Sequence, residues 1–414
     1  MSGLRTVRGT RDLLPEDSLR LRRVEATAWE TARRYGYGEV ETPIFEFDEV
    51  FKRTLGDTSD VVTKEMYTFE DRGGDGLTLR PENTAGIVRA FISNNLAARL
   101  PLRVFYRGPM FRYERPQKGR LRQFHQVGVE LLGVADPLAD VEVIKLAVDF
   151  LTELELGESF RIEINTLGDS ESRAGYRGRL LEYFEDSKDC LSADSLARLE
   201  RNPLRILDSK DPGDRQVVAG APRLADALNE RSRAFFADVL RGLDDLHIEY
   251  EVNPRLVRGL DYYCHTTFEF VTHRLGAQGT LLAGGRYDGL VEQMGGQPTP
   301  GTGWAAGVER LMMLAESAFT EPPRPIAMIA LGPEQFSTAS GKADTLRQDH
   351  VVVFGFGSSL GKQLKWANKI NARWAVIIGS DELARGMATI RDMDAGAQEE
   401  VPLAMLEERL AGSG

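Results

Sequence analysis

The chain has 414 residues, of which 42% are hydrophobic and 28% charged, and its 63 acidic and 52 basic side chains give a formal net charge of −11. This length predicts two or three domains, and the acidic balance argues against indiscriminate nucleic-acid binding, although local basic patches could still hold RNA. Because the sequence has no apolar run near the roughly 20 residues of a membrane helix, no signal-peptide pattern and only two cysteines, we expect a cytoplasmic protein without a disulfide framework.

A helix and a strand are the first elements that the sequence predicts. Apolar residues on one face favour an amphipathic helix over residues 17–35, capped at its start by Asp17 or Ser18. The alternation of residues 39–45 then predicts a strand. Because Pro43 has no N–H to donate, this strand belongs at a sheet edge, which is either an ordinary edge or the place where a second subunit lies.

Beyond these elements, the pattern predicts an α+β core that a helical segment interrupts. Residues 170–250 are mostly helical in pattern and rich in Arg, Asp, Leu and Ala, which indicates an insertion. The prolines in residues 320–325 predict a linker, because proline continues neither a helix nor a ladder. Residues 326–414 alternate strands with helices and predict a small α/β domain. Within the core of residues 1–324, strands are expected at 76–80, 103–107, 126–132, 160–165, 268–272 and 279–283, and helices near 140–153 and from Gly307.

The segment from Arg107 to Gln126 reverses the sign of the charge locally. It carries six basic side chains in twenty residues against one acid, Glu114. The planar fork of arginine suits phosphate oxygens, and Phe124 could stack on a base. A solvated basic hairpin is the alternative. The basic side chains are Arg107, Arg112, Arg115, Lys118, Arg120 and Arg122.

Two segments carry polar groups that suit an amino-acid ligand. Glu82 and Thr84 follow a predicted strand as a carboxylate and a hydroxyl, a pair that either holds an α-ammonium group or caps the following helix. Phe124, Gln126 and Glu130 share one face of another predicted strand. Because an unpaired buried carboxylate is costly, that face is either a ligand site or a solvated sheet face.

Three glycine-containing segments complete the pattern. RGLDYY occupies residues 258–263 and AGGRYDGL residues 283–290. The third segment, residues 303–310, ends in GVER and sets an arginine at a helix start, where backbone amides favour anions. The adjacent Cys264 and His265 could begin a metal site, but no further ligands have suitable spacing, so we expect ordinary packing and no protein-bound metal.

Taken together, these segments resemble the class II aminoacyl-tRNA synthetases and, within them, the histidyl-tRNA synthetases. The resemblance covers nearly the whole chain. The helix and strand around Pro43 are similar to the dimer-forming first motif of the family, residues 108–130 to its second and residues 303–310 to its third. RGLDYY and AGGRYDGL are similar to two signatures of the histidine enzymes. The resemblance implies a homodimer with a mixed, mainly antiparallel catalytic sheet, an insertion that contacts the acceptor stem, and an anticodon-binding C-terminal domain.

The resemblance also implies a reaction and the residues that carry it. Histidine and ATP, with Mg²⁺ bridging the phosphates and no prosthetic group, would form histidyl-adenylate and pyrophosphate, and the histidine would then move to the 3′ end of its tRNA. Arg112 and Arg258 are the implied catalytic residues, on opposite sides of the α-phosphate. Implied histidine ligands are Glu82, Thr84, Arg112, Gln126, Glu130, Arg258, Tyr262, Tyr263 and Tyr287. Implied ATP contacts are Arg112, Glu114, Arg120, Phe124 and Arg310.

For tRNA, the resemblance implies contacts from two regions. One is the loop with Arg115, Gln117 and Lys118, which would meet the acceptor end. The other is a basic face of the C-terminal domain, with Trp366 nearby, which suits an anticodon or is a solvated lysine face. The residues at helical spacing on that face are Lys362, Lys365, Lys369 and Arg373.

Two other functions fit parts of the pattern. A catalytically silent relative that regulates ATP phosphoribosyltransferase would share the core, but that lineage generally lacks the C-terminal domain and has eroded motifs. A pure RNA-binding module would leave the implied adenine and amino-acid contacts without purpose. The presence of Arg112, Arg258 and Arg310 together with residues 326–414 favours the enzyme.

Overall fold

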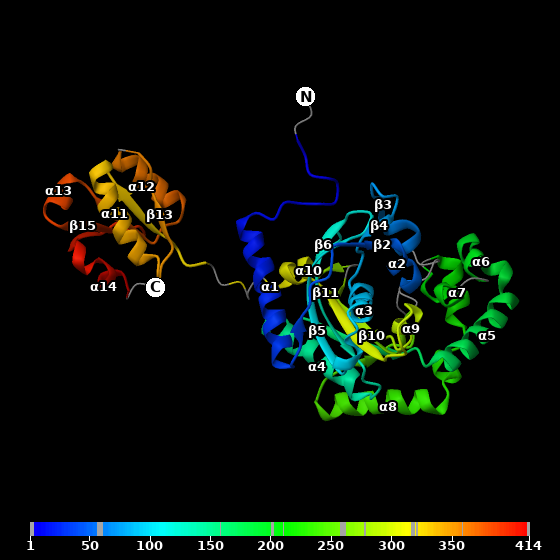
Figure 1. The fold of residues 1–414 in the computed structure, drawn as a ribbon. Helices are drawn as coiled ribbons and strands as arrows, with labels where there is room; N and C mark the ends of the chain where they lie inside the picture. The colour runs from blue at the N-terminus through cyan, green and yellow to red at the C-terminus, as the bar shows by residue number, and fades with distance from the viewer. Residues whose placement is uncertain are drawn as a thin grey trace. The chain divides into compact units, whose positions relative to one another are not determined.

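Two compact units make up the chain, Met1–Phe319 and Thr320–Gly414 (Figure 1). Each unit has its own sheet and its own hydrophobic core. Among the described residues, no helix has both the length and the apolar character that crossing a membrane requires. The computed structural model describes residues 4–55, 61–157, 159–199, 203–209, 211–256, 262–276, 279–315, 319, 322–357 and 359–411.

An eight-stranded sheet lies at the centre of the described part of the first unit, in the order β1-β5-β6-β11-β10-β9-β7-β8. The edge strands β1 and β8 pair in parallel with β5 and β7, and all the other pairs are antiparallel. The expected mixed, mainly antiparallel sheet is therefore confirmed. Its strands are β1 (Gly38–Glu39), β5 (Leu102–Phe111), β6 (Gln123–Leu132), β7 (Arg161–Thr166), β8 (Glu251–Val252), β9 (Cys264–Val271), β10 (Thr280–Arg286) and β11 (Gly301–Gly307).

The strand predicted over residues 39–45 is divided between two sheets. β1 ends at Glu39 on the edge of the eight-stranded sheet, whereas β2 (Phe45–Phe47) joins β4 (Gly76–Leu79) and β3 (Tyr67–Glu70) in a separate three-stranded sheet. Pro43 lies between the two, where no ladder needs an N–H. The prediction of one continuous strand is therefore wrong, while its position at an edge is confirmed.

Four helices cover one face of the eight-stranded sheet. α4 (Leu138–Glu153) packs against both α1 (Pro15–Arg34) and α8 (Glu230–Asp245), and α10 (Val308–Leu314) packs on α1. Trp304 of β11 reaches into this layer, since its indole nitrogen donates to the carbonyl oxygen of Val143 in α4 at 2.9 Å. These helices and the sheet enclose the largest apolar cluster of the unit.

The first helix begins two residues earlier than the sequence predicts. Pro15 occupies its first turn, where a missing N–H costs nothing, and the residue before it, Leu14, makes no side-chain cap. The expected capping by Asp17 or Ser18 is therefore wrong. The hydroxyl of Ser18 instead donates to the carbonyl oxygen of Leu13 at 3.0 Å.

A helical segment separates β7 from β8. Its helices are α5 (Ser170–Asp186), α6 (Ala193–Leu199), α7 (Pro212–Ala219) and α8, and Figure 1 shows α5, α6 and α7 gathered together. They enclose a small apolar cluster of their own. Asp169 caps α5 by accepting from the backbone N–H of Ser172 at 2.9 Å. The segment is thus a helical insertion between two strands of the central sheet.

The second unit contains a five-stranded sheet in its described residues, in the order β13-β12-β14-β15-β16. β12 pairs in parallel with β13 and β14, and the remaining pairs are antiparallel. Helix α11 follows β12, and α12 connects β13 to β14, as expected for a small α/β domain. The elements are β12 (Ile326–Ala330), α11 (Pro333–Leu346), β13 (Val352–Phe354), α12 (Leu360–Lys369), β14 (Trp374–Ile378), α13 (Ser380–Ala384), β15 (Met387–Asp392), β16 (Gln398–Pro402) and α14 (Leu406–Ala411).

The basic face predicted for α12 is shorter than the spacing indicates. Arg373 lies beyond the helix, directly before β14, and its guanidinium pairs with Asp392 at 2.8 Å. Trp366 packs against an apolar cluster of the unit. The placement of Arg373 on this helix face is therefore wrong.

Candidate active site

A cavity of about 400 Å³ opens on the face of the central sheet opposite α1 and α4. Side chains alternate between the two faces along β6. Val127 and Val129 join the apolar cluster under the helices, whereas Phe124 and Gln126 line the cavity on the opposite face. Most of the residues implied for histidine and ATP line this cavity. They are Glu82, Thr84, Arg112, Glu114, Arg120, Phe124, Gln126, Tyr262, Tyr263 and Arg310.

Glu82 both caps a helix and lines the cavity. Its two carboxylate oxygens accept from the backbone N–H groups of Thr84 at 2.7 Å and Ala85 at 3.0 Å, at the start of α3 (Thr84–Ser93). Burial raises the pKa of Glu82, while these backbone hydrogen bonds act in the opposite direction. The two interpretations of this residue, cap and cavity wall, are thus compatible.

Glu130 is buried behind the cavity wall, with 1% of its surface exposed. The hydroxyl of Thr84 donates to its Oε1 at 2.7 Å, and the hydroxyl of Tyr287 donates to its Oε2 at 2.5 Å. Burial raises the pKa of Glu130 to about 8. Glu130 and Tyr287 do not line the cavity themselves, and a solvated sheet face is excluded for Glu130.

Glycines make the space that the Glu130 carboxylate occupies. Gly303 of β11 lies directly opposite Glu130 of β6 in the antiparallel register. A Cβ atom at Gly303 would collide with Oε2 of Glu130 and with the backbone oxygen of Val129. In the same way, a Cβ atom at Gly128 would collide with the hydroxyl of Tyr106. The central strands are therefore cleared of side chains beneath the cavity.

The titration of Glu130 has an expected effect on stability. Its pKa is about 8 in the folded protein against the ordinary 4.5, so between these values the folded chain holds a proton that the unfolded chain has released. The stabilisation from this group is complete below about pH 4.5 and is lost as the pH rises through 8. Glu130→Gln keeps the shape and cannot ionise. We expect the melting temperature of Glu130→Gln minus that of the wild type to rise between about pH 5 and 8 and then level off, as measured by thermal unfolding; a constant difference would contradict the shifted pKa.

Away from Glu82 and Glu130, the cavity wall contains the guanidinium groups of Arg310, Arg120 and Arg112, which lie close together. Burial lowers the pKa of Arg310, and the neighbouring charges of Arg120 and Arg112 lower it further. Nε of Arg310 donates to the carbonyl oxygen of Gly119 at 3.1 Å, and Nη1 donates to that of Thr280 at 2.6 Å. Because neighbouring cations repel one another at short range, this end of the cavity favours an anionic ligand.

Arg112 is held at the boundary between the two ends. Its Nε donates to the carbonyl oxygen of Pro81 at 2.8 Å, and its guanidinium carbon lies 5.4 Å from the ring centroid of Phe124. Arg112 directly follows β5, and Phe124 lies near the start of β6, so the β5–β6 hairpin positions both. The guanidinium is thereby fixed between the acidic end, with Glu82, and the other arginines.

An ion pair joins two of the residues implied for ATP. Nη2 of Arg120 donates to Oε1 of Glu114 at 2.9 Å, and its Nε contacts Oε2 of the same carboxylate. Glu114 is buried, whereas the side chain of Arg120 is 40% exposed. A ligand that contacts either group must therefore compete with this pair.

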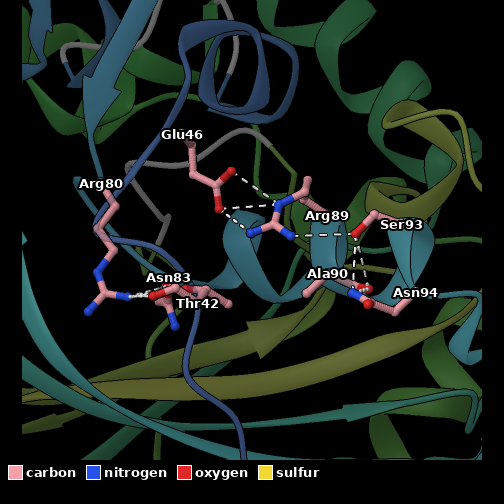
Figure 2. A network of polar contacts seen from close by, with 8 residues as sticks. All are labelled: Thr42, Glu46, Arg80, Asn83, Arg89, Ala90, Ser93 and Asn94. Carbon is pink, nitrogen blue, oxygen red and sulfur yellow. Dashed lines mark hydrogen bonds and ion pairs between the residues drawn. The ribbon is translucent and has the colours of Figure 1, made fainter.

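A buried polar network supports the turn that carries Glu82 and Thr84 (Figure 2). Arg80 donates through Nη1 to the carbonyl oxygen of Thr42 at 2.9 Å. The Thr42 hydroxyl donates to Oδ1 of Asn83 at 2.6 Å. Asn83 is fully buried and does not line the cavity. Hydrogen bonds to Thr42, next to Pro43, therefore hold this turn in place on the side away from the cavity.

The remaining predicted residues lie elsewhere. Arg258 lies outside the described residues. Arg115, Gln117 and Lys118 are exposed in the β5–β6 connection, beside Gly119 of the cavity wall, and Lys362, Lys365 and Lys369 are exposed on α12. No group of side chains suited to a metal ion occurs among the described residues. The sulfur of Cys264 accepts from the backbone N–H of Asp288 at 3.3 Å, and His265 packs on Phe235 with ring centroids 4.5 Å apart.

Several cavity residues escaped the sequence-based prediction. Glu269 of β9 and Glu309 of α10 both line the cavity. Glu309 accepts from the backbone N–H of His125 at 2.9 Å and contacts its Nδ1 at 2.9 Å, and Glu269 accepts from the hydroxyl of Thr280 at 2.9 Å. Phe268 and Phe270 flank Glu269 in the strand and are both buried in the main apolar cluster. Their period of two could have revealed that Glu269 faces the cavity.

Comparison with known proteins identifies the family. Residues 9–311 match the model of the histidyl-tRNA synthetases, and residues 326–412 match that of the anticodon binding domain. The chain belongs to the histidyl-tRNA synthetase family. It is 62% identical to the histidine–tRNA ligase of Rhodospirillum rubrum over 99% of both chains. It is 54% identical to that of Gluconacetobacter diazotrophicus, over 100% of this chain and 99% of the other.

A solved structure supports the same conclusion. The crystal structure of apo histidyl-tRNA synthetase from S. aureus matches with a TM-score of 0.82 and 33% sequence identity. The match covers 98% of this chain and 99% of the other. The resemblance inferred from the motifs and the predicted fold class are thus both confirmed, and the family is one of ATP-using aminoacyl-tRNA synthetases.

Proposed function

We propose that the protein is a histidine–tRNA ligase whose chemistry takes place in the cavity above β6 and β11. The supporting observation is the distribution of charge in a chain of the histidyl-tRNA synthetase family. Glu82 and the buried Glu130 lie close together on one side of this cavity, and Arg112, Arg120 and Arg310 lie close together on the other, where Glu114, Glu269 and Glu309 only partly offset their charge. The acidic end suits the ammonium group of an amino acid. The basic end suits the phosphates of ATP.

Histidine binds at the acidic end in this proposal. Glu82, Thr84 and Gln126 hold its α-ammonium group. Glu130 and Tyr263 pair with the two ring nitrogens, after the Thr84 hydroxyl has turned from Glu130 towards the ligand. Tyr262 completes the wall, and Tyr287 lies behind it and holds the carboxyl of Glu130. The buried carboxyl of Glu130 supports this assignment, because an unpaired group of this kind discriminates strongly against a side chain that cannot bond to it.

ATP binds at the basic end. Arg112 contacts the α-phosphate, Arg120 the terminal phosphates, and Glu114 the adenine amino group once the Glu114–Arg120 pair has opened. Phe124 and Arg310 hold the two faces of adenine. The substrate brings Mg²⁺ with it, and Glu269 offers oxygen ligands in the same cavity.

The reaction follows from this arrangement. An oxygen of the histidine carboxylate attacks the α-phosphorus, the bond from that phosphorus to the bridging oxygen breaks, and pyrophosphate leaves. Arg112 stabilises the charge that gathers on the phosphoryl oxygens, and the family resemblance assigns the same role to Arg258. A hydroxyl of the terminal tRNA ribose then attacks the acyl carbon, and AMP leaves with the electrons of the broken acyl–phosphate bond.

Two further parts of the proposal concern macromolecules. The exposed residues Arg115, Gln117 and Lys118 meet the acceptor end of tRNA, the helical insertion contacts its stem, and the second unit binds the anticodon with Lys362, Lys365 and Lys369. A homodimer forms through the region around Pro43, where Ile44, Phe45 and Phe47 are 44%, 55% and 57% exposed. Several exposed apolar side chains close together in the chain are typical of a protein interface. We place this activity in the cytoplasm.

Pyrophosphate exchange tests the amino-acid specificity. The purified protein should move labelled pyrophosphate into ATP when histidine is present, and the other nineteen amino acids should give rates near background. The pairing of both ring nitrogens is the physical reason. A folded protein without histidine-dependent exchange would contradict the proposal, and exchange with another amino acid would reassign the substrate.

A further inference from the structure

The part of the second unit formed by β13, α12 and β14 carries an unusual charge. From His350 to Ser380 the sequence has no Asp or Glu, although the whole chain has 63 acidic side chains in 414 residues. Lys362, Lys365 and Lys369 are exposed here and form no ion pair with a described carboxylate. On helix α11 of the same unit, by contrast, Lys342 pairs with Glu407 at 2.9 Å. The surface of α12 is therefore positive and unneutralised within an acidic protein.

An exposed aromatic ring stands in the loop that leads into α12. Phe356 is 87% exposed and lies between two glycines. The side chain of Gln363 donates from Nε2 to the carbonyl oxygen of Gly357, which ties the loop to the first turn of the helix. At Gly355 a Cβ atom would meet the ring of Trp366 at 3.0 Å, so the backbone lies close against that ring. The loop is thus pinned on both sides of Phe356, while the phenyl ring itself projects into solvent.

The position of this loop in the sheet is typical of a binding site. β13 and β12 are parallel neighbours, and the loop follows the carboxyl end of β13. Ligands of open α/β sheets bind beyond the carboxyl ends of the strands. Along α12, the positions 362, 365 and 369 fall on one side of the helix, adjacent to the side on which Trp366 meets the loop. The ring and Lys362, in the first turn of α12, therefore border the same end of the sheet, and Lys365 lies one turn further along the helix.

We propose that Phe356 is a stacking platform for an unpaired base of the tRNA anticodon loop, with the adjoining phosphates at Lys362 and Lys365. Single-stranded nucleic acids are commonly held by an aromatic face together with a basic surface that follows the backbone. The inference rests on the proposed function, and it adds a residue that the sequence motifs do not single out. Stacking requires no rearrangement, because the ring is already presented on a fixed loop.

Direct binding of RNA to the full-length protein tests this inference. The probe is a labelled hairpin with the anticodon stem and loop of histidine tRNA, titrated in a fluorescence anisotropy assay at fixed salt. Phe356→Leu keeps an apolar side chain but removes the aromatic face, so we expect the dissociation constant to rise about 5- to 150-fold. Phe356→Trp should bind within about twofold of the wild type, because it keeps a stacking surface.

Matched controls separate stacking from general damage. Val351→Ala changes an apolar side chain that is 49% exposed in the same unit, at the amino end of β13 and away from the loop, and should leave the dissociation constant unchanged. A hairpin with only the acceptor stem should bind all variants equally. Equal binding of the anticodon hairpin by wild type and Phe356→Leu would overturn the inference, as would equal weakening on both hairpins. Histidine-dependent exchange needs no RNA, so its absence in the wild type would count against the proposed function alone.

Discussion

Arg112→Ala is expected to lower the rate of histidine-dependent pyrophosphate exchange about 10²- to 10³-fold, the usual effect of removing one donor that stabilises a transition state. Arg112 lies between the acidic and the basic ends of the cavity, with its Nε fixed on Pro81. In the proposed arrangement, its guanidinium therefore sits where the carboxylate of histidine meets the α-phosphate of ATP. We expect it to stabilise the charge that develops on the phosphoryl oxygens.

The separate effects of Arg112→Ala on kcat and on KM distinguish this role from simple binding. A group that acts in the transition state should lower kcat and kcat/KM together, while the KM for histidine changes little. Arg103→Ala is a suitable control, because Arg103 lies at the other end of β5 and pairs with Glu142 at 2.8 Å. It should exchange pyrophosphate at the wild-type rate. A change in Arg112→Ala confined to KM would show that Arg112 only holds ground-state ligands.

Glu130→Gln is expected to reduce kcat/KM for histidine in the exchange assay by about 10³-fold or more, towards the 10⁴–10⁵ discrimination that a buried polar site can reach. The substitution keeps the volume, and its amide can accept from one of the hydroxyls of Thr84 and Tyr287 and donate to the other, so the fold should survive. It replaces an acid that can release its proton when a histidine ring binds with an amide that does not ionise. The effect should therefore fall on histidine rather than on ATP.

Kinetic constants for both histidine and ATP test whether the effect of Glu130→Gln is specific to histidine. The KM for ATP should remain within about twofold of the wild type. Tyr287→Phe provides a graded comparison, because it removes one hydrogen bond to Glu130 and leaves the carboxyl in place. Its loss should be smaller, about tenfold or less, the size expected for one buried hydrogen bond. Equal losses for histidine and ATP in Glu130→Gln would instead indicate a collapsed cavity.

The sequence predicts the helices and the hairpin strands well where one periodic face is buried. The apolar face of α1 is one case, since Val24, Ala28 and Ala32 recur at helical spacing and are all buried. β5 and β6 extend further than predicted, to Phe111 and from Gln123, because the antiparallel pairing continues through Gly108 and Pro109 opposite Gln126 and His125. Glycine and proline have low strand propensity and conceal this extension in the sequence.

β11 shows where sequence reasoning stops. Residues 301–307 are mostly glycine and alanine, which have low strand propensity, so no strand is predicted there. Tertiary pairing with β6 and β10 on both sides overrides that preference. The motif at residues 303–310 is recognisable in the sequence, but the strand that forms its first half is not.

The site is predictable only in part for a similar reason. Its members are named by motif resemblance, whereas their mutual contacts join distant positions. Tyr287 donates to Glu130 across 157 residues, and Thr42 donates to Asn83 across 41 residues. Local spacing contains no information about such pairs. The brace behind the Glu82 turn is accordingly visible only in the folded chain.

The glycines in the central strands make room for polar groups inside the sheet. Gly284, Gly303 and Gly128 have no room for a methyl group, since each would strike a neighbouring strand or an inward side chain. None of the three lines the cavity. Substitution at any of them should disturb the layer in which the Glu130 carboxyl and the Tyr106 phenol lie. These glycines therefore keep the sheet thin enough for a carboxyl group and a phenol to lie within it.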